Sequence, residues 1–347
     1  MEFSLHLFSI YHHQYRIFMK KSRICFLSCL FILSQFASQS FAQRGKQVDN
    51  TKILRSVQKK YGLDPDQPLE KRIEKTPDSV IKMFRDAGMS PTAHILTEEE
   101  INIVAAAVAA LPPLHRRVLK QHLKSISFLD NMPNTALTAP ITNKESAKLY
   151  HITFRAGILH QSISDWVTGK ERTCFAVGDS TISISIQAGL LSALTYVMLH
   201  EGTHVVDGSV GLLSTDTIQG RPVANQFRDK FAKNIWGNFR LPVWQFADSL
   251  AAKSIFRPSG RRFALNEAER VYKGLAQMPF VSLYSTASWH EDLAELLTIY
   301  HLTKVLHQPF QVVVTKNGRQ DYRFEPMSSP AVKHRVEQLE RFYRNTN

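Results

Sequence analysis

Two histidines and a glutamate between Leu199 and Asp207 have the spacing of a hydrolytic metal site. His200 and His204 are four positions apart, so on a helix of about 3.6 residues per turn both rings leave one face, a turn apart. Two neutral imidazoles placed in this way can bind one cation, typically zinc. Glu201 lies beside them, close enough to take a proton from metal-activated water without being a ligand. The sequence therefore predicts a helical zinc site with Glu201 as general base.

A third ligand is expected on another helix, and the segment 289–295 is the best candidate. Glu291 and Glu295 share a helical face, where two like charges repel each other unless a cation or a buried histidine compensates them. Glu291 is predicted to ligate the metal, and Glu295 to accept the free ring N–H of a ligating histidine and so fix its tautomer. Two alternatives stay open. Glu291 could close a capping box with Ser288, or His290 could be the third ligand.

Together these residues resemble a gluzincin, the group of zinc peptidases whose third ligand is a glutamate on a later helix. More narrowly, they resemble the catalytic domain of the anthrax lethal factor family. In that family the second histidine is followed by two residues and an aspartate, as His204 is followed by Asp207 here. A tyrosine also precedes the ligand glutamate by seven residues, as Tyr284 precedes Glu291, and the glutamate opens a Glu-x-x-Ala-Glu run.

The resemblance implies a zincin-like fold and the hydrolysis of peptide bonds. It implies a catalytic set of His200, His204 and Glu291 as zinc ligands, Glu201 as general base, and Tyr284 as a donor to the oxyanion or leaving group. Asp207 either orients His204 or caps the end of its helix, and the residues leave both roles open. The 87 positions from His204 to Glu291 are more than this family leads us to expect. The substrate therefore cannot be carried over.

Regular elements are predicted where they could position these residues. Apolar side chains at helical spacing lead into the metal motif, and Gly189 and Gly208 punctuate the helix that they predict. The alternation Thr-Ile-Ser-Ile-Ser-Ile at 181–186 predicts a half-buried strand. We interpret 182–186 as the sheet strand that edges the cleft and could pair with an extended peptide. An ordinary sheet strand is the alternative interpretation.

The chain is predicted to be an α+β protein with a zincin-like metallopeptidase core. That core comprises a mixed β-sheet, the active-site helix and a mainly helical C-terminal part. The other predicted elements are strands at 125–129 and 150–154, helices at 97–111, 114–123, 227–239, 243–256 and 288–305, a hairpin at 311–324 and a last helix from 329. Residues 43–96 are expected to form a charged, helical or partly ordered lead-in, and 97–347 the metallopeptidase-like domain.

Residues 1–42 have the three regions of a secretory signal peptide. Basic residues precede an apolar run at 24–37, which is too short for a comfortable membrane span. Ser40-Phe41-Ala42 indicates cleavage after Ala42. Met19 is a better start than Met1, because it places the basic residues at the terminus. We expect a secreted or periplasmic protein with no stable transmembrane span after cleavage; an uncleaved signal anchor is the alternative.

The chain is basic, with a formal net charge of +13. The excess persists without the signal peptide and favours contact with anionic components of the cell envelope. Nucleic acid is not expected as a partner, because the secretory route leads away from it. Of three cysteines only Cys174 lies beyond the signal peptide, so no intramolecular disulfide is expected and stability must come from a core.

We therefore expect Zn²⁺ as the cofactor and a protein or peptide as the substrate. The alternative is a catalytically inactive zincin-fold protein with a binding or assembly role in the cell envelope. The presence of Glu201 argues against that alternative, because a purely structural zinc site has no use for a general base. The sequence does not indicate the oligomeric state.

Overall fold

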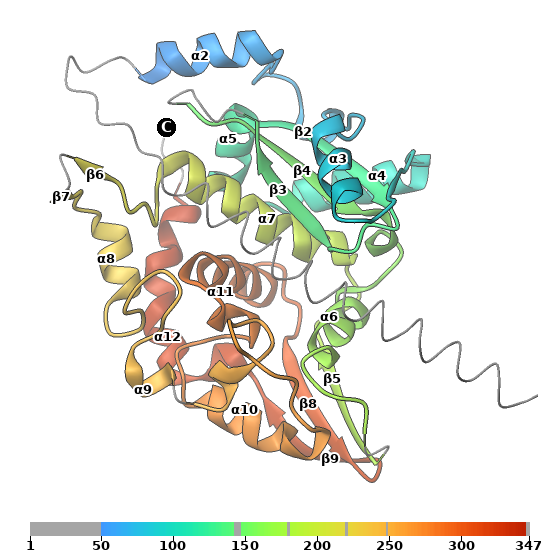
Figure 1. Cartoon of the computed structure of the whole chain (residues 1–347), viewed down its shortest axis with the longest axis vertical. Helices are drawn as coiled ribbons and strands as arrows, with labels where there is room; N and C mark the ends of the chain where they lie inside the picture. The colour runs from blue at the N-terminus through green and yellow to red at the C-terminus, as the bar shows by residue number, and fades with distance from the viewer. Residues whose placement is uncertain (1–49, 142–146, 179–180, 219–220, 248, 345–347) are drawn as a thin grey trace, which may run out of the picture.

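The computed structural model of this chain describes residues 50–141, 147–178, 181–218, 221–247 and 249–344. The predicted signal peptide, 1–42, lies outside the described residues. Within the described ranges, no helix combines the length and the apolar character that crossing a membrane requires. Figure 1 shows two helices side by side at the centre, α7 (Ala193–Val210) and α11 (Trp289–Lys304), with one β-sheet above them and another below.

The upper sheet has four strands and is mixed. Its order is β1-β2-β4-β3, where β2 and β4 run parallel and the outer strands are antiparallel to their neighbours. The bounds are β1 (Thr92–Ala93), β2 (Leu123–Asp130), β3 (Ala136–Pro140) and β4 (Tyr150–Arg155). The strands predicted at 125–129 and 150–154 are confirmed as β2 and β4. The edge strand β3 was not predicted, because its segment contains prolines and shows no alternation.

The lower sheet is antiparallel and has the order β5-β8-β9. Its strands are β5 (Ile182–Gln187), β8 (Gln311–Lys316) and β9 (Arg319–Phe324). The half-buried strand at 182–186 and the hairpin are therefore confirmed. The interpretation of 182–186 as the strand of the mixed sheet beside the active-site helix is wrong, because β5 pairs with β8 instead. Alternation reveals that one face of a strand is buried, but not which strand it pairs with.

The helices around the upper sheet include part of the expected lead-in. They are α2 (Asn50–Tyr61), α3 (Asp78–Asp86), α4 (Glu98–Ala109) and α5 (Pro113–His122), with 3₁₀ turns η2 (Leu69–Lys71) and η3 (Ala156–Ile158). Helix α6 (Ile163–Arg172) instead packs against β5 of the lower sheet and against α7. Helix α4 begins with the capping box of Thr97 and Glu100 that the sequence predicts. Within 43–96, β1 pairs with β2, and the buried Arg72 side chain donates to backbone carbonyls that include those of Leu119 and Leu123. The domain division at 96 stays a prediction.

The region between α7 and α11 contains short elements. They are β6 (Thr217–Ile218), β7 (Arg221–Pro222), α8 (Gln226–Ala232), α9 (Trp244–Ala247), η4 (Ala251–Lys253), η5 (Leu265–Glu267), α10 (Ala268–Ala276) and η6 (Tyr284–Thr286). The helices expected at 227–239 and 243–256 are much shorter than predicted. After α8 the chain turns so that Trp236 forms an isolated antiparallel bridge with Pro242, which interrupts helical continuity. The chain ends in η7 (Pro326–Ser328), α12 (Pro330–Val336) and η8 (Glu337–Phe342).

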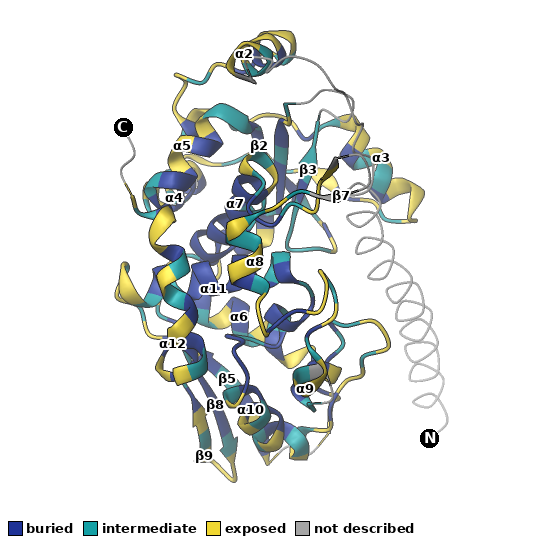
Figure 2. Ribbon diagram, turned by 90° about the vertical axis from the view of Figure 1, so that its left-hand side faces the viewer, coloured by how far each residue is buried: buried dark blue, intermediate teal, exposed yellow. Residues whose placement is uncertain are grey.

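Most residues of the two central helices are buried, as the dark blue of α7 and α11 in Figure 2 shows. Helix α7 extends past Gly208 and ends at Gly211, whose positive φ of 66° forms the left-handed cap. The expectation that Gly208 ends the helix is therefore wrong. A Cβ at Gly208 would lie 2.3 Å from the Tyr150 hydroxyl, so this glycine allows close packing against β4. The resulting α+β fold places the metal motif in the middle of the core.

Candidate metal centre

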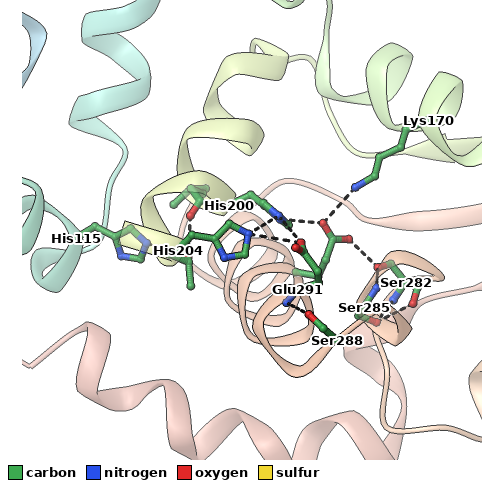
Figure 3. Close-up of polar contacts among 11 residues, drawn as sticks. His115, Lys170, His200, His204, Ser282, Ser285, Ser288 and Glu291 are labelled. Carbon is green, nitrogen blue, oxygen red and sulfur yellow. Dashed lines mark hydrogen bonds and ion pairs between the residues drawn. The ribbon is translucent and has the colours of Figure 1, made fainter. Parts of the chain in front are cut away.

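Helices α7 and α11 bring the three predicted ligands together (Figure 3). The Nε2 atoms of His200 and His204 lie 3.2 Å apart. Glu291 Oε2 lies 3.0 Å from His200 Nε2 and 3.5 Å from His204 Nε2. One nitrogen from each ring and one carboxylate oxygen thus face a common point. Among the described residues, these three form the group whose ligand atoms are close enough to hold a metal ion.

The geometry of these atoms fits a zinc ion. Zinc bonds of about 2.0–2.1 Å in tetrahedral directions place neighbouring ligand atoms about 3.3 Å apart. The three separations of 3.0, 3.2 and 3.5 Å bracket that value. Two imidazole nitrogens with one carboxylate oxygen also form a donor set of catalytic zinc sites, which leave a fourth position for water or substrate. His200, His204 and Glu291 would therefore hold the metal.

The charges around the ligands favour a cation at this point. Burial lowers the pKa of His200, but the carboxylates of Glu291 and Glu295 outweigh burial and raise that pKa to about 10. Burial is likewise outweighed at His204, where Glu291 raises the pKa. Burial would raise the pKa of Glu291, yet His204 and His200 hold it well below its usual value. In each case positive charge between the rings and the carboxylate is stabilised, as a bound cation would be.

The structure distinguishes Glu291 from its two alternatives. Ser288 is the N-cap of α11, and its Oγ accepts a hydrogen bond from the Glu291 backbone N–H at 3.3 Å. The Glu291 carboxylate does not return to Ser288, as a full capping box requires, but faces the histidines. His290 lies outside the ligand group, and its Nδ1 is 2.6 Å from Asp207 Oδ2.

Glu295 lies one turn after Glu291 and is 1 % exposed. Its Oε1 is 3.1 Å from His200 Nδ1, although the ring N–H is not aligned with that oxygen as in a full hydrogen bond. Its Oε2 accepts a 2.6 Å hydrogen bond from Ser282 Oγ. Burial would raise the pKa of Glu295, but Lys170 and His200 hold it at about 2. The ionised carboxylate therefore faces the His200 ring, and its role in orienting that ring stays a prediction.

The two residues predicted to be catalytic adjoin this group. Glu201 follows His200 on α7, and its Oε2 accepts a 2.6 Å hydrogen bond from Thr138 Oγ1 on the edge strand β3. The Tyr284 ring in η6 stacks on the His200 ring at a centroid distance of 5.8 Å. Burial and the carboxylates of Glu291, Glu201 and Glu295 raise the pKa of Tyr284 well above its usual value. Its hydroxyl is thus protonated at neutral pH and can donate.

Asp207 caps the end of α7 and does not reach His204. Its Oδ1 accepts a 2.7 Å hydrogen bond from the Leu213 backbone N–H, and its Oδ2 contacts His290 Nδ1. Of the two roles left open by the sequence, the geometry therefore favours the cap. The pair with His290 also joins the end of α7 to the beginning of α11.

Thr138, Lys170 and Ser282 contact the predicted site but were not identified from the sequence. Thr138 is 63 residues from Glu201, and Lys170 is 125 residues from Glu295. No periodic pattern or short motif links residues at such separations. Ser282 is only 13 residues from Glu295, but it lies in an irregular segment, where serine is most simply interpreted as a turn residue.

Comparisons with known proteins give little further information. No protein-family model matches this chain, and no curated protein matches it. A solved structure described as "a putative zinc-binding metallo-peptidase from Bacteroides caccae" is similar with a TM-score of 0.33 and 12 % sequence identity. The similarity covers 87 % of this chain and 88 % of that one. A likeness this weak carries no argument about activity, so the functional assignment depends on the geometry of the site.

Proposed function

We propose that this protein is a zinc-dependent metallopeptidase of the gluzincin type that hydrolyses peptide bonds. The observation that carries the proposal is the convergence of His200, His204 and Glu291 at zinc-like separations, with Glu201 on the same helix. The finer similarity to the anthrax lethal factor family depends on Asp207 and Tyr284 and belongs to the proposal.

The reaction requires a nucleophile and a base. His200, His204 and Glu291 would hold a zinc ion, which would supply a Lewis acid and would bring the pKa of a water ligand near neutrality. Glu201 takes a proton from the attacking water and delivers it to the amine that leaves. Thr138 holds one oxygen of Glu201 at 2.6 Å, which leaves the other oxygen for the proton transfer.

Tyr284 stabilises the charge that develops on the substrate carbonyl oxygen. Its protonated hydroxyl is a hydrogen-bond donor, and the stack on His200 places the ring beside a metal ligand. Such a donor acts mainly on the transition state, where the oxygen carries most charge. Tyr284 therefore contributes to kcat.

An extended peptide chain would bind along β3. This strand pairs with β4 on one side and is the last strand in the order of its sheet. Its Thr138 contacts Glu201, so a peptide paired with the outer edge of β3 would pass beside the general base. Backbone pairing of this kind accepts many sequences, which suits a peptidase.

We also propose that the protein acts outside the cytoplasm, either in the periplasm or as a secreted enzyme. The signal-peptide pattern of 1–42 supports this location. The basic charge of the chain supports contact with anionic cell-envelope components, and a protein or peptide is the proposed substrate.

The test compares Glu201→Gln with the wild type on a library of fluorogenic peptides. The wild type is expected to cleave members of the library. Glu201→Gln should retain its zinc and lose about 10²-fold to 10⁴-fold in kcat, the scale of a general base. Glu269→Gln is the matched control, because Glu269 is a surface residue that pairs with Lys273.

Each outcome separates the proposal from its alternatives. Full activity in Glu201→Gln would contradict the assignment of the base. A wild type that binds zinc but cleaves no peptide would instead favour a catalytically inactive zincin-fold binding or assembly protein of the cell envelope.

A further inference from the structure

Lys170 lies behind the candidate metal centre and contacts two residues of the proposed machinery at once. It belongs to α6, and its side chain is 22 % exposed. The Nζ atom is 3.4 Å from Glu295 Oε1 and 3.9 Å from the centroid of the Tyr284 ring. Figure 3 shows its side chain reaching toward the site from a different part of the chain than α7 and α11.

The contact with Glu295 acts on the carboxylate oxygen that faces the ligand ring. Glu295 Oε1 lies between Lys170 Nζ at 3.4 Å and His200 Nδ1 at 3.1 Å. The other oxygen accepts a hydrogen bond from Ser282. Lys170 and Ser282 therefore fix the carboxylate from two sides, and the carboxylate in turn limits the rotation of the His200 ring.

The contact with Tyr284 fixes the plane of its ring. A cation 3.9 Å from the ring centroid is within the range of a cation–π interaction. The Phe256 ring packs edge-on against Tyr284 at a centroid distance of 4.9 Å, and His200 stacks on it at 5.8 Å. With these neighbours the direction of the hydroxyl is set before a substrate arrives.

We propose that Lys170 is a positioning residue, which orients the ligand His200 through Glu295 and the hydroxyl donor Tyr284 through its ring face. This inference rests on the proposed function, because both targets belong to that site. It differs from a merely structural role, in which Lys170 would only favour the ionised form of its buried neighbour Glu171. A structural role would change stability, whereas a positioning role changes metal affinity and kcat.

The experiment measures zinc affinity by competition with a chromophoric chelator for the wild type, Lys170→Met and Lys170→Arg. Lys273→Met is the matched control, because Lys273 also pairs with a glutamate and lies over a tyrosine ring, Tyr322, but on the surface. Lys170→Met should weaken zinc binding by about 10-fold or more, the scale of losing a group that orients a ligand. Lys170→Arg keeps the charge and the ring contact and should restore most of the affinity.

Two further readouts test the mechanism. In cobalt-substituted protein, the visible absorption bands should shift in Lys170→Met, because the His200 ring turns relative to the metal. In peptide hydrolysis, kcat should fall about 10-fold with little change in KM, because Tyr284 acts on the transition state. Should Lys170→Met fail to fold, Lys170→Gln, which loses the positive charge and the cation–π contact with Tyr284, is expected to weaken zinc binding in the same direction.

Equal zinc affinity in the Lys170 variants and Lys273→Met would overturn the inference. A wild type that binds zinc without cleaving peptides would contradict the proposed function alone, since zinc affinity still decides the role of Lys170. A wild type that binds no zinc would overturn both.

Discussion

Helix α11 carries two adjacent acidic residues with opposite surroundings. Asp292 points toward α12, where Arg335 donates to both of its oxygens at 3.0 and 2.6 Å and Trp236 Nε1 donates at 2.9 Å. Glu291 points toward α7, where its carboxylate meets two imidazole rings. Asp292 is fully buried, whereas the Glu291 side chain is 14 % exposed, and only Asp292 has a permanently charged partner.

The surroundings of Asp292 are those of a charge that stabilises the fold, and those of Glu291 are those of a charge that can bind a metal. The Asp292–Arg335 pair is electrically neutral and both Asp292 oxygens accept hydrogen bonds within the chain, so no added cation is needed there. Around Glu291, the carboxylates of Glu291 and Glu295 lie one helical turn apart, and the ammonium group of Lys170 contacts Glu295. The ring nitrogens also converge on one point, which a divalent cation would occupy. An acidic residue in the interior therefore indicates a functional site when no permanently charged residue of the same chain neutralises it.

Removing Arg335 should leave Asp292 as a buried charge without a counter-ion. Arg335→Met is expected to lower the free energy of unfolding by about 3–5 kcal/mol, because Asp292 remains buried. Urea denaturation measures the loss, and zinc affinity should stay near that of the wild type. Arg344→Met is the control, since its exposed pair with Glu340 should contribute at most about 1 kcal/mol. Equal losses of stability in Arg335→Met and Arg344→Met would mean that the Asp292–Arg335 pair matters no more than an exposed ion pair.

Loss of the Tyr284 hydroxyl should affect catalysis and leave the metal in place. Tyr284→Phe is expected to lower kcat by about 10²-fold to 10³-fold, as for the loss of one oxyanion donor. Steady-state kinetics on a cleaved peptide, with zinc content measured in parallel, tests this. Tyr300→Phe serves as control. An unchanged kcat would mean that Tyr284 only packs against His200.

The metal-free protein should lose stability as the pH rises. The pKa of His200 is raised to about 10 from the 6.5 of an unperturbed histidine. Its contribution is therefore complete below pH 6.5 and is lost as the pH rises through about 10. We expect a decrease on the order of 2 kcal/mol in the free energy of unfolding over this window.

Zinc should remove this pH dependence, because ligand histidines carry no proton on the metal-binding nitrogen. Urea denaturation with a chelator and with excess zinc, each from pH 6 to 10, compares the two states. His200→Asn in chelator provides the control and should lack the decrease. A metal-free wild type with the same flat profile would speak against the pairing of His200 with the carboxylates.

The smallest effect is expected at His290. His290→Asn should retain the wild-type zinc content and lose about 1 kcal/mol of stability, because one hydrogen bond to Asp207 disappears. Elemental analysis and urea denaturation measure the two quantities. Loss of zinc in this variant would instead make His290 a ligand.

The sequence predicted best what depends on local spacing. His200, Glu201 and His204 lie within one helical turn, and the capping box of α4 spans a similar distance. The hairpin between β8 and β9 follows from Asn317-Gly318, both of which have positive φ. Glu291 was predicted because Glu291 and Glu295 are four positions apart, as His200 and His204 are.

What the sequence missed depends on contacts between distant segments. Strand β3 and its Thr138 lack a periodic pattern, and Lys170 is an ordinary helix lysine until folding brings it to Glu295. Alternation likewise predicts that β5 is a strand but does not indicate that it pairs with β8. In the region between α7 and α11, the bridge of Trp236 with Pro242 lies within the stretch where the apolar pattern extended a helix to 239.

Zinc content of the purified protein tests the central claim most directly. Elemental analysis at neutral pH should find one zinc ion per chain in the wild type, and its loss or strong weakening in both His204→Ala and Glu291→Ala. Glu269→Ala, a surface substitution, should retain the metal. A wild type that takes up no zinc when it is supplied, or a Glu291→Ala variant that binds it as tightly as the wild type, would contradict the proposed centre.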